Sequence, residues 1–133
     1  MQSGNWATYA TYEQGSGTLV DANARELTFL VFDLGASADD LGGMAWVDGP
    51  QQYVAHTVCA EVAGDSAWFT YQIPADATFA AGSWVTFNVT AAGAVGYAVG
   101  TEAAMVGLCE TQTAVSGGWA GTVSGTVIVH PGS

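Results

Sequence analysis

Short apolar segments rich in Val, Thr, Phe, Tyr and Trp recur at intervals of roughly ten to fifteen residues, separated by Gly, Asp, Ala and Ser, which is typical of all-β proteins. About eight such segments are expected to form strands. Residues 120–130 form a ninth if the short segment 17–20 is counted as a strand. The segments cover residues 6–13, 17–20, 26–33, 43–47, 52–63, 67–73, 83–90, 95–108 and 120–130.

The clearest alternation of apolar and polar side chains lies between residues 84 and 90, where successive positions should face opposite sides of a sheet. The positions expected to face the core are Val85, Phe87 and Val89. The positions expected to face water are Trp84, Thr86, Asn88 and Thr90. In 67–73, the same rule buries Phe69, Tyr71 and Ile73 and turns Thr70 and Gln72 outward, and Pro74 then ends the strand.

The pattern favours a single antiparallel up-and-down barrel of about eight strands, with a β-sandwich as the second choice. Glycines inside the expected strands, such as Gly96 and Gly125, allow the bends that a curved sheet needs. Residues 21–26 and 101–105 have only enough helix-forming character for about one turn each. No linker or repeat divides the chain, so residues 1–133 are interpreted as one β-domain.

Charge narrows the range of partners. The chain has 12 acidic residues and one basic residue, Arg25, which gives a net charge of -11. Nucleic acid and anionic membranes are therefore poor partners, because both are bound by clustered Lys and Arg. No apolar run reaches the roughly eighteen residues of a membrane-spanning helix, so membrane insertion is not expected.

Cys59 and Cys109 are the only cysteines, and a disulfide between them is the first interpretation, with two buried thiols as the second. Closing a loop of this length would stabilise the fold by about 4 kcal/mol in the chain-entropy model. Their spacing does not match a zinc site, and no metal is expected. Met1 is followed by polar residues without a signal-peptide pattern, so either the chain is cytoplasmic or a leader has been removed.

No catalytic residue and no cofactor can be assigned from motifs. His56 and His130 are the only candidates for a general base, and His56 is expected to be a hydrogen-bonded packing residue on an apolar face with Val54 and Val58. The carboxylates considered for glycoside chemistry are Glu61, Glu102 and Glu110, and those considered for calcium are Asp33, Asp39, Asp40 and Asp48. Both sets are interpreted as solvated charges.

The stretch 54–69, which contains His56, Cys59, Gly64 and Trp68, resembles a family of small secreted actinobacterial β-proteins of unknown function. A Gly-rich opening at 15–18 adds to this resemblance, which covers about half of the chain. The sequence departs from the family after Val89, where Thr90 to Val95 replaces a polar turn. The resemblance implies a secreted β-domain and no particular activity.

The aromatic residues suggest binding rather than catalysis, since rings that do not fit the core can stack on a flat ligand. The expected ligand-binding residues are Phe69, Tyr71, Trp84, Phe87 and Val89, with Trp84 as the exposed member. Weaker candidates are Trp6, Tyr9, Tyr12 and Trp119.

The expected function is therefore a secreted or cell-surface, non-enzymatic binding module. Its partner would be a small apolar molecule held in the barrel, or a protein or glycan held on exposed aromatic rings. Two alternatives remain open. One is a cofactor-independent, cyclase-like barrel enzyme, and the other is a structural subunit of a virion, filament or surface layer. A homo-oligomer is compatible with each.

Overall fold

The computed structural model describes residues 13–33, 41–117 and 122–130, which contain nine strands and one helix. In chain order the elements are β1 (Glu13–Asp21), β2 (Glu26–Asp33), β3 (Leu41–Asp48), β4 (Gln51–His56), β5 (Cys59–Ala63), β6 (Ser66–Gln72), β7 (Trp84–Thr90), β8 (Val95–Gly100), α2 (Glu102–Glu110) and β9 (Thr122–His130). The all-β prediction is confirmed.

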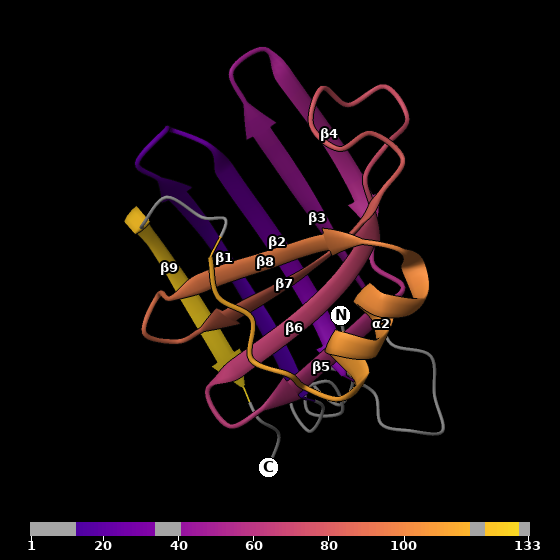
Figure 1. Cartoon of the computed structure of the whole chain (residues 1–133). Helices are drawn as coiled ribbons and strands as arrows, with labels where there is room; N and C mark the ends of the chain where they lie inside the picture. Colours follow the sequence, from indigo (N-terminus) through magenta and orange to yellow (C-terminus); the bar gives the residue numbers. More distant parts are fainter. Residues whose placement is uncertain (1–12, 34–40, 118–121, 131–133) are drawn as a thin grey trace, which may run out of the picture.

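The strands form two antiparallel sheets that cross each other (Figure 1). The five-stranded sheet has the order β4-β3-β2-β1-β9, and the four-stranded sheet has the order β5-β6-β7-β8. Neighbours along the chain pair with each other in both sheets, and β9 returns to pair with β1. Between the described strands, no ladder joins one sheet to the other, so the observed arrangement is two layers around a shared core.

The chain passes from one sheet to the other at a corner after β4. The Thr57 backbone N–H donates to Gly42 O in the five-stranded sheet, and the Val58 N–H donates to Thr70 O in the four-stranded sheet. The expected single strand 52–63 is therefore wrong. It is two strands, β4 and β5, which belong to different sheets because the corner between them redirects the backbone hydrogen bonds.

Stacked aromatic rings fill the space between the sheets. Phe69 lies between Phe29, at 4.9 Å between ring centroids, and Phe87, at 5.4 Å. Phe87 also contacts Trp46 at 6.2 Å and Tyr97 at 5.2 Å. As the alternation predicted, the inward residues of β6 and β7, together with Ile73, are buried: Phe69, Tyr71, Ile73, Val85, Phe87 and Val89.

The polar residues of the same strands are a correction. Thr70, Thr86 and Asn88 were expected to face water, but all three are buried. The cause is the segment 95–108, which was expected to be one strand. It is a strand followed by a helix, β8 and α2, and α2 packs against the other face of the four-stranded sheet (Figure 1).

Hydrogen bonds satisfy these buried polar groups. The hydroxyls of Thr70 and Thr86 lie 2.7 Å apart, and both lie within hydrogen-bonding distance of Met105 O in α2, at 3.3 and 2.6 Å, so that one hydroxyl can donate to the other and the second to the carbonyl. Asn88 donates to Ala67 O and accepts from the Val115 N–H in the segment after the helix. The polar side chains therefore fasten α2 and the following segment to the sheet, where unpaired groups would be costly.

The Cys59–Cys109 disulfide is confirmed and joins β5 to α2. Both cysteines are buried against Trp68, whose indole N–H donates to Thr113 O at 2.8 Å. The four-stranded sheet thus has both faces covered, one by the other sheet and one by α2 with the segment after it. The five-stranded sheet packs against the core with one face, and none of the described helices or strands covers its other face.

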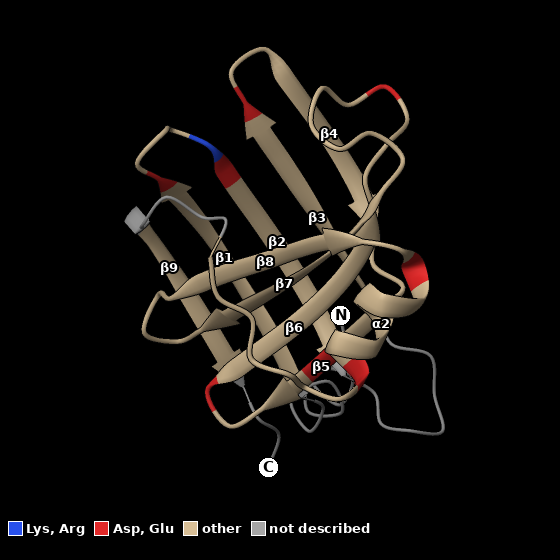
Figure 2. Ribbon diagram, in the orientation of Figure 1, with Lys and Arg blue, Asp and Glu red and all other residues tan. Residues whose placement is uncertain are grey.

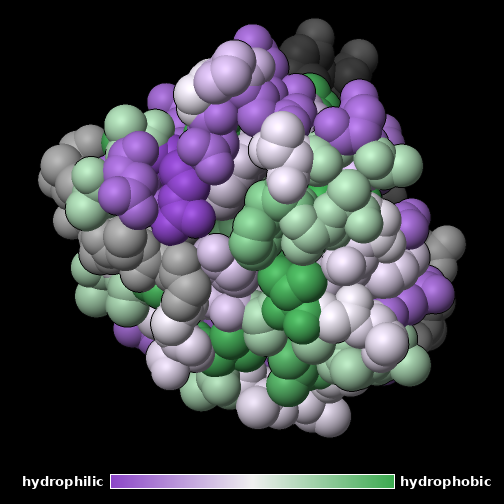
Figure 3. All heavy atoms as spheres, turned by 45° about the horizontal axis from the view of Figure 1, so that its top comes forward, coloured by the Kyte–Doolittle hydropathy of each residue, from purple (hydrophilic) through white to green (hydrophobic). Residues whose placement is uncertain are grey.

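The turn between β1 and β2 contains the only basic residue of the chain, which lies among acidic neighbours in Figure 2. The buried carboxylate of Asp21 accepts hydrogen bonds from the backbone N–H groups of Asn23 and Arg25, and the Arg25 guanidinium binds it at 2.6 Å. Arg25 also lies over the ring of Trp46, 5.8 Å from the centroid. In Figure 3 hydrophilic residues gather around this end of the molecule.

Replacing Asp21 by Asn is expected to lower the free energy of unfolding by about 2 kcal/mol at neutral pH, because charge-assisted hydrogen bonds are lost. Burial alone would raise the pKa of Asp21, but the hydrogen bonds from Arg25 and Asn23 outweigh burial and hold this pKa below its ordinary value. A lowered folded-state pKa contributes stability above the unfolded value of about 3.9, and that stability is lost as the pH falls.

Urea unfolding at a series of pH values from about 7 down to about 3 measures this effect, because stability from a lowered carboxyl pKa is lost progressively below about pH 5. The difference in unfolding free energy between the wild type and Asp21→Asn should shrink as the pH falls. The other carboxylates titrate in both proteins, so their contribution to the pH dependence cancels in this difference. A difference that stays constant with pH would contradict the role of the Asp21 charge.

Candidate binding surface

The five-stranded sheet has one face toward the core and one face away from it. Alternation along its strands places buried residues such as Leu27, Phe29 and Met44 inward, so their neighbours point outward. We call these outward residues the outer face. Those with described side chains are Gln14, Ser16, Thr18, Val20, Glu26, Thr28, Leu30, Phe32, Gly43, Ala45, Val47, Gln52, Val54, His56, Thr126 and Ile128.

Large apolar side chains on the outer face are open to solvent. Val54 is 79% exposed, Ile128 60% and Leu30 48%. They lie on three different strands, β4, β9 and β2, and therefore spread across the width of the sheet. Polar residues such as Ser16 and Thr28 lie between and beside them. Single exposed apolar residues are common, whereas several on one face of a sheet suggest a site of interaction.

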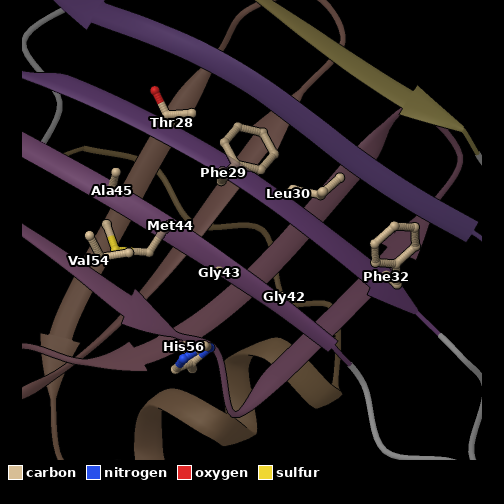
Figure 4. A pocket seen from close by; sticks show the side chains of 10 residues that line it. All are labelled: Thr28, Phe29, Leu30, Phe32, Gly42, Gly43, Met44, Ala45, Val54 and His56. Carbon is tan, nitrogen blue, oxygen red and sulfur yellow. The ribbon is translucent and has the colours of Figure 1, made fainter.

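A groove runs over the middle of β3 on the outer face (Figure 4). Its floor contains Gly43 and Ala45, which have small or no side chains. Leu30 stands on the β2 side, and Val54 and His56 stand on the β4 side. The groove has a volume of about 470 Å³ and is largely open to solvent. Small residues between two rows of larger ones thus produce an apolar hollow.

A second hollow of about 530 Å³ lies beside the groove, over β1 and β9. Its outward side chains include Ser16, Thr18 and Ile128, and Gly125 contributes bare backbone. A Cβ atom on Gly125 would collide with Thr18 O, so this glycine is required for the close approach of the two strands. Both hollows include Thr28 and Phe29, which makes them neighbours on one surface.

Charge is nearly absent from the outer face. Among its described residues Glu26 is the only acidic one, and it lies at the first position of β2. Of the other described acidic residues, Glu61 lies in the middle of β5 in the smaller sheet, and the rest lie in turns or loops or at the ends of strands and of the helix (Figure 2). A chain with a net charge of -11 therefore has a broad neutral surface in the centre of its larger sheet.

The residues expected to bind a ligand lie elsewhere. Phe69, Tyr71, Phe87 and Val89 are at most 1% exposed and are packed among other core side chains, while Trp84 is half-buried at the start of β7. The first four lie together in the core, whereas Trp84 does not belong to it. A ligand-binding role for all five stays a prediction.

Tyr71 illustrates their surroundings. Its hydroxyl lies 3.2 Å from that of Tyr53, and burial is the main factor that raises its pKa, with a further rise from the neighbouring Tyr53. A raised pKa keeps this hydroxyl protonated at neutral pH, where it serves as a buried hydrogen-bonding group.

His56 differs from the expectation of a packed histidine. It shares an apolar surface with Val54, as expected, but this surface is the outer face, and His56 is exposed there. The reason is that β4 is an edge strand whose alternate residues turn away from the core. The strand position of His130 pairs with Gln14, and its side chain lies outside the described set.

The candidate carboxylates lie on two elements, Glu61 on β5 and both Glu102 and Glu110 on α2. Glu61 accepts a hydrogen bond from Gln112 at 3.2 Å, whereas Glu102 and Glu110 are exposed at opposite ends of α2. No group of three or more His, Cys, Asp or Glu side chains that could hold a metal ion occurs among the described residues. Trp6, Tyr9, Tyr12, Asp39, Asp40 and Trp119 lie outside those residues.

Sequence reasoning missed the outer face, although one signal for it is present. Between Leu27 and Phe32 both faces of the strand contain apolar residues. A face exposed to water would have polar residues at every second position, but Leu30 and Phe32 occupy two of these positions. Strands of this composition are usually covered on both faces. The described part of the structure covers only one face of β2.

Comparison with known proteins gives no match, whether with protein-family models, with curated proteins or with solved structures. Within the described residues, α2 is too short to cross a membrane. The surface chemistry of the chain itself is thus the basis for a functional proposal.

Proposed function

We propose that the protein is a non-enzymatic binding module that uses the outer face to hold a protein partner with an apolar surface. The observation that carries this proposal is the unequal covering of the two sheets. The helix α2 and the segment after it cover the four-stranded sheet. The five-stranded sheet exposes Leu30, Val54 and Ile128 around two hollows.

A protein partner fits this surface better than a small ligand or a glycan does. The hollows are open and adjoining, whereas small-molecule sites enclose most of the ligand surface. Glycans are commonly held on exposed aromatic rings, and among the described large apolar residues that are strongly exposed, Phe79 is the one aromatic. It lies in the loop between β6 and β7 and not on the outer face.

A ligand enclosed in a closed barrel was the other part of the expectation, and it stays a prediction. Buried stacked rings occupy the space between the sheets. The enzyme alternative has no specific observation in its favour. The structural-subunit alternative has one, because a filled core combined with an exposed apolar face suits a chain that assembles with other chains.

We further propose that the protein acts outside the cell or on its surface. The disulfide supports this location, since such bonds persist mainly in oxidising compartments. The high acidic charge is compatible with a highly soluble secreted protein. The resemblance of 54–69 to secreted actinobacterial β-proteins points in the same direction and stays a prediction.

The neutral dye Nile red, whose fluorescence rises in apolar surroundings, is a suitable probe of the outer face. Gly43→Val should reduce dye binding in dilute solution at least several-fold, because the new side chain fills the groove floor. A Cβ at Gly43 meets only Ala55 O, at 3.5 Å, so the sheet accommodates it. Valine also favours strand structure.

Gly107→Val is the matched control. Gly107 lies in α2, and a Cβ there meets nothing within 4 Å. This variant should bind the dye as the wild type does. Absence of dye binding by the wild type, or equal binding by Gly43→Val, would contradict an accessible apolar groove on the outer face.

A further inference from the structure

We infer that the partner held by the outer face is a second copy of this chain, so that two five-stranded sheets pack face to face in a two-fold symmetric dimer. This inference rests on the proposed function and names the partner of the same surface. It is carried by the distribution of charge, by the area of the outer face and by the shape of its groove.

Charge selects the face through which two copies can meet. Each copy has a net charge of -11, so two copies repel each other at most orientations. Among the acidic residues whose side chains are described, Glu26 alone lies on the outer face, while the others lie in turns or loops, at strand or helix ends or, for Glu61, on the smaller sheet. Contact through this face leaves the described carboxylates other than Glu26 outside the interface and places mostly neutral side chains between the copies.

The same charge argues against many other partners. A basic protein would gain most from the acidic turns and not from the neutral centre of the sheet. An acidic or neutral protein could use the outer face only if it had an apolar surface of similar shape. A second copy carries the same apolar surface, and an isologous interface uses that surface twice.

The area of the outer face is sufficient for a specific dimer. Five strands at a spacing of about 4.8 Å give a width of about 24 Å. Strands of about eight residues at about 3.3 Å per residue give a length of about 26 Å. Two copies would together bury about 1,200 Å², which is the lower limit of specific interfaces. Projecting side chains would add to this area.

The outer face has both projecting side chains and a hollow, which are the two features that a self-complementary surface needs. It presents both projecting apolar side chains, Leu30, Val54 and Ile128, and a groove floored by Gly43 and Ala45. In a two-fold arrangement the projecting residues of each copy enter the hollow of the other. Interdigitation of this type fills the space between stacked sheets, which lie about 10 Å apart.

An interface of this composition responds to salt in a distinctive direction. Salt screens the repulsion between two acidic molecules and leaves apolar contact intact or strengthened. The dimer should therefore become tighter as salt rises. Association through ion pairs would become weaker under the same change.

Sedimentation velocity over a series of protein concentrations tests the inference on the full chain. The wild type should move from monomer to dimer as concentration rises, and sodium chloride should lower the dissociation constant. Val54→Glu should raise the dissociation constant about 100-fold or more, because it buries an unpaired carboxylate from each copy. Ile128→Glu should have an effect in the same direction.

Phe79→Glu is the control, since Phe79 and Leu30 are equally exposed, at 48%, and the charge change matches that of Val54→Glu. It should dimerise within a few-fold of the wild type. Near-UV circular dichroism verifies that each variant is folded, and Val54, at 79% exposure, is a mild position to substitute.

The outcomes separate this inference from the proposed function. A wild type that remains monomeric, or a dimer that Val54→Glu leaves intact, overturns the second copy as partner. Dye binding that depends on Gly43 would then still support the outer face as a binding surface for another protein. A monomer without such dye binding would overturn both.

Discussion

Replacing Phe87 by Ala is expected to lower the free energy of unfolding by about 3–5 kcal/mol, the usual cost of deleting a fully buried ring. Phe87 is 1% exposed and stacks on Phe69 and Tyr71, with centroids at 5.4 and 6.2 Å. Trp46 and Tyr97 contact it from the two sheets. The cavity left by alanine would remove the centre of the aromatic core.

Urea unfolding at one fixed protein concentration measures this effect, because self-association would make stability depend on concentration. Phe79→Ala is the control and should cost less than about 1 kcal/mol, since its ring is largely exposed. If the two variants lost similar stability, the rings between the sheets would not form the tight core described above.

Removing the disulfide by Cys59→Ala together with Cys109→Ala is expected to cost about 4 kcal/mol, because the bond closes a loop of 50 residues in the unfolded chain. The contact of α2 with the four-stranded sheet should weaken as well. Hydrogen bonds at Met105 O and Thr113 O would then hold the helix and the segment after it to the sheet without the covalent link.

Thermal unfolding with and without reductant, combined with hydrogen exchange, measures both parts of this prediction. Amides of α2 should exchange faster in the double variant than in the wild type, while those of β1 and β2 should change less. Because both sulfurs are buried, the wild type should resist reductant until it unfolds. Equal stability of the double variant and the wild type would contradict a stabilising role for the bond.

The strands β6 and β7 show how far alternation predicts structure. Phe69, Tyr71, Phe87 and Val89 are buried as the sequence indicates, because an apolar residue at every second position has to face a core. The prediction for Thr70 and Thr86 fails, since a sequence pattern does not reveal that a distant helix covers the second face. Their hydroxyls pair with each other and with α2, which alternation alone cannot show.

Two element boundaries were missed for separate reasons. The break between β4 and β5 has no Gly or Pro, because Thr57 and Val58 turn the corner through backbone hydrogen bonds to both sheets. The helix α2 begins at a Thr101 cap followed by Glu102, and the sequence indicated about one helical turn there, but the apolar residues that follow were also assigned to a strand that continues to residue 108. In both places the local sequence continues the pattern while tertiary contacts change the structure.

The outer face was missed because sequence alone does not fix which side of a half-apolar strand faces the core. In β4, Tyr53 and Ala55 alternate with Val54 and His56, and either pair could be inward. The structure turns Tyr53 inward, where it meets Tyr71 and Trp46. Val54 is then left in solvent, and an ordinary core-like residue becomes part of a candidate interface.

The most direct test of this account is the solvent accessibility of outer-face methyl groups, measured by NMR with a neutral soluble paramagnetic agent. The account predicts that methyls of Leu30, Val54 and Ile128 are shielded at high protein concentration, approach the shielding of the core residue Val89, and become accessible on dilution. The Phe79 ring should remain accessible at both concentrations. Outer-face methyls that stay accessible at high concentration, while another surface becomes shielded, would contradict it.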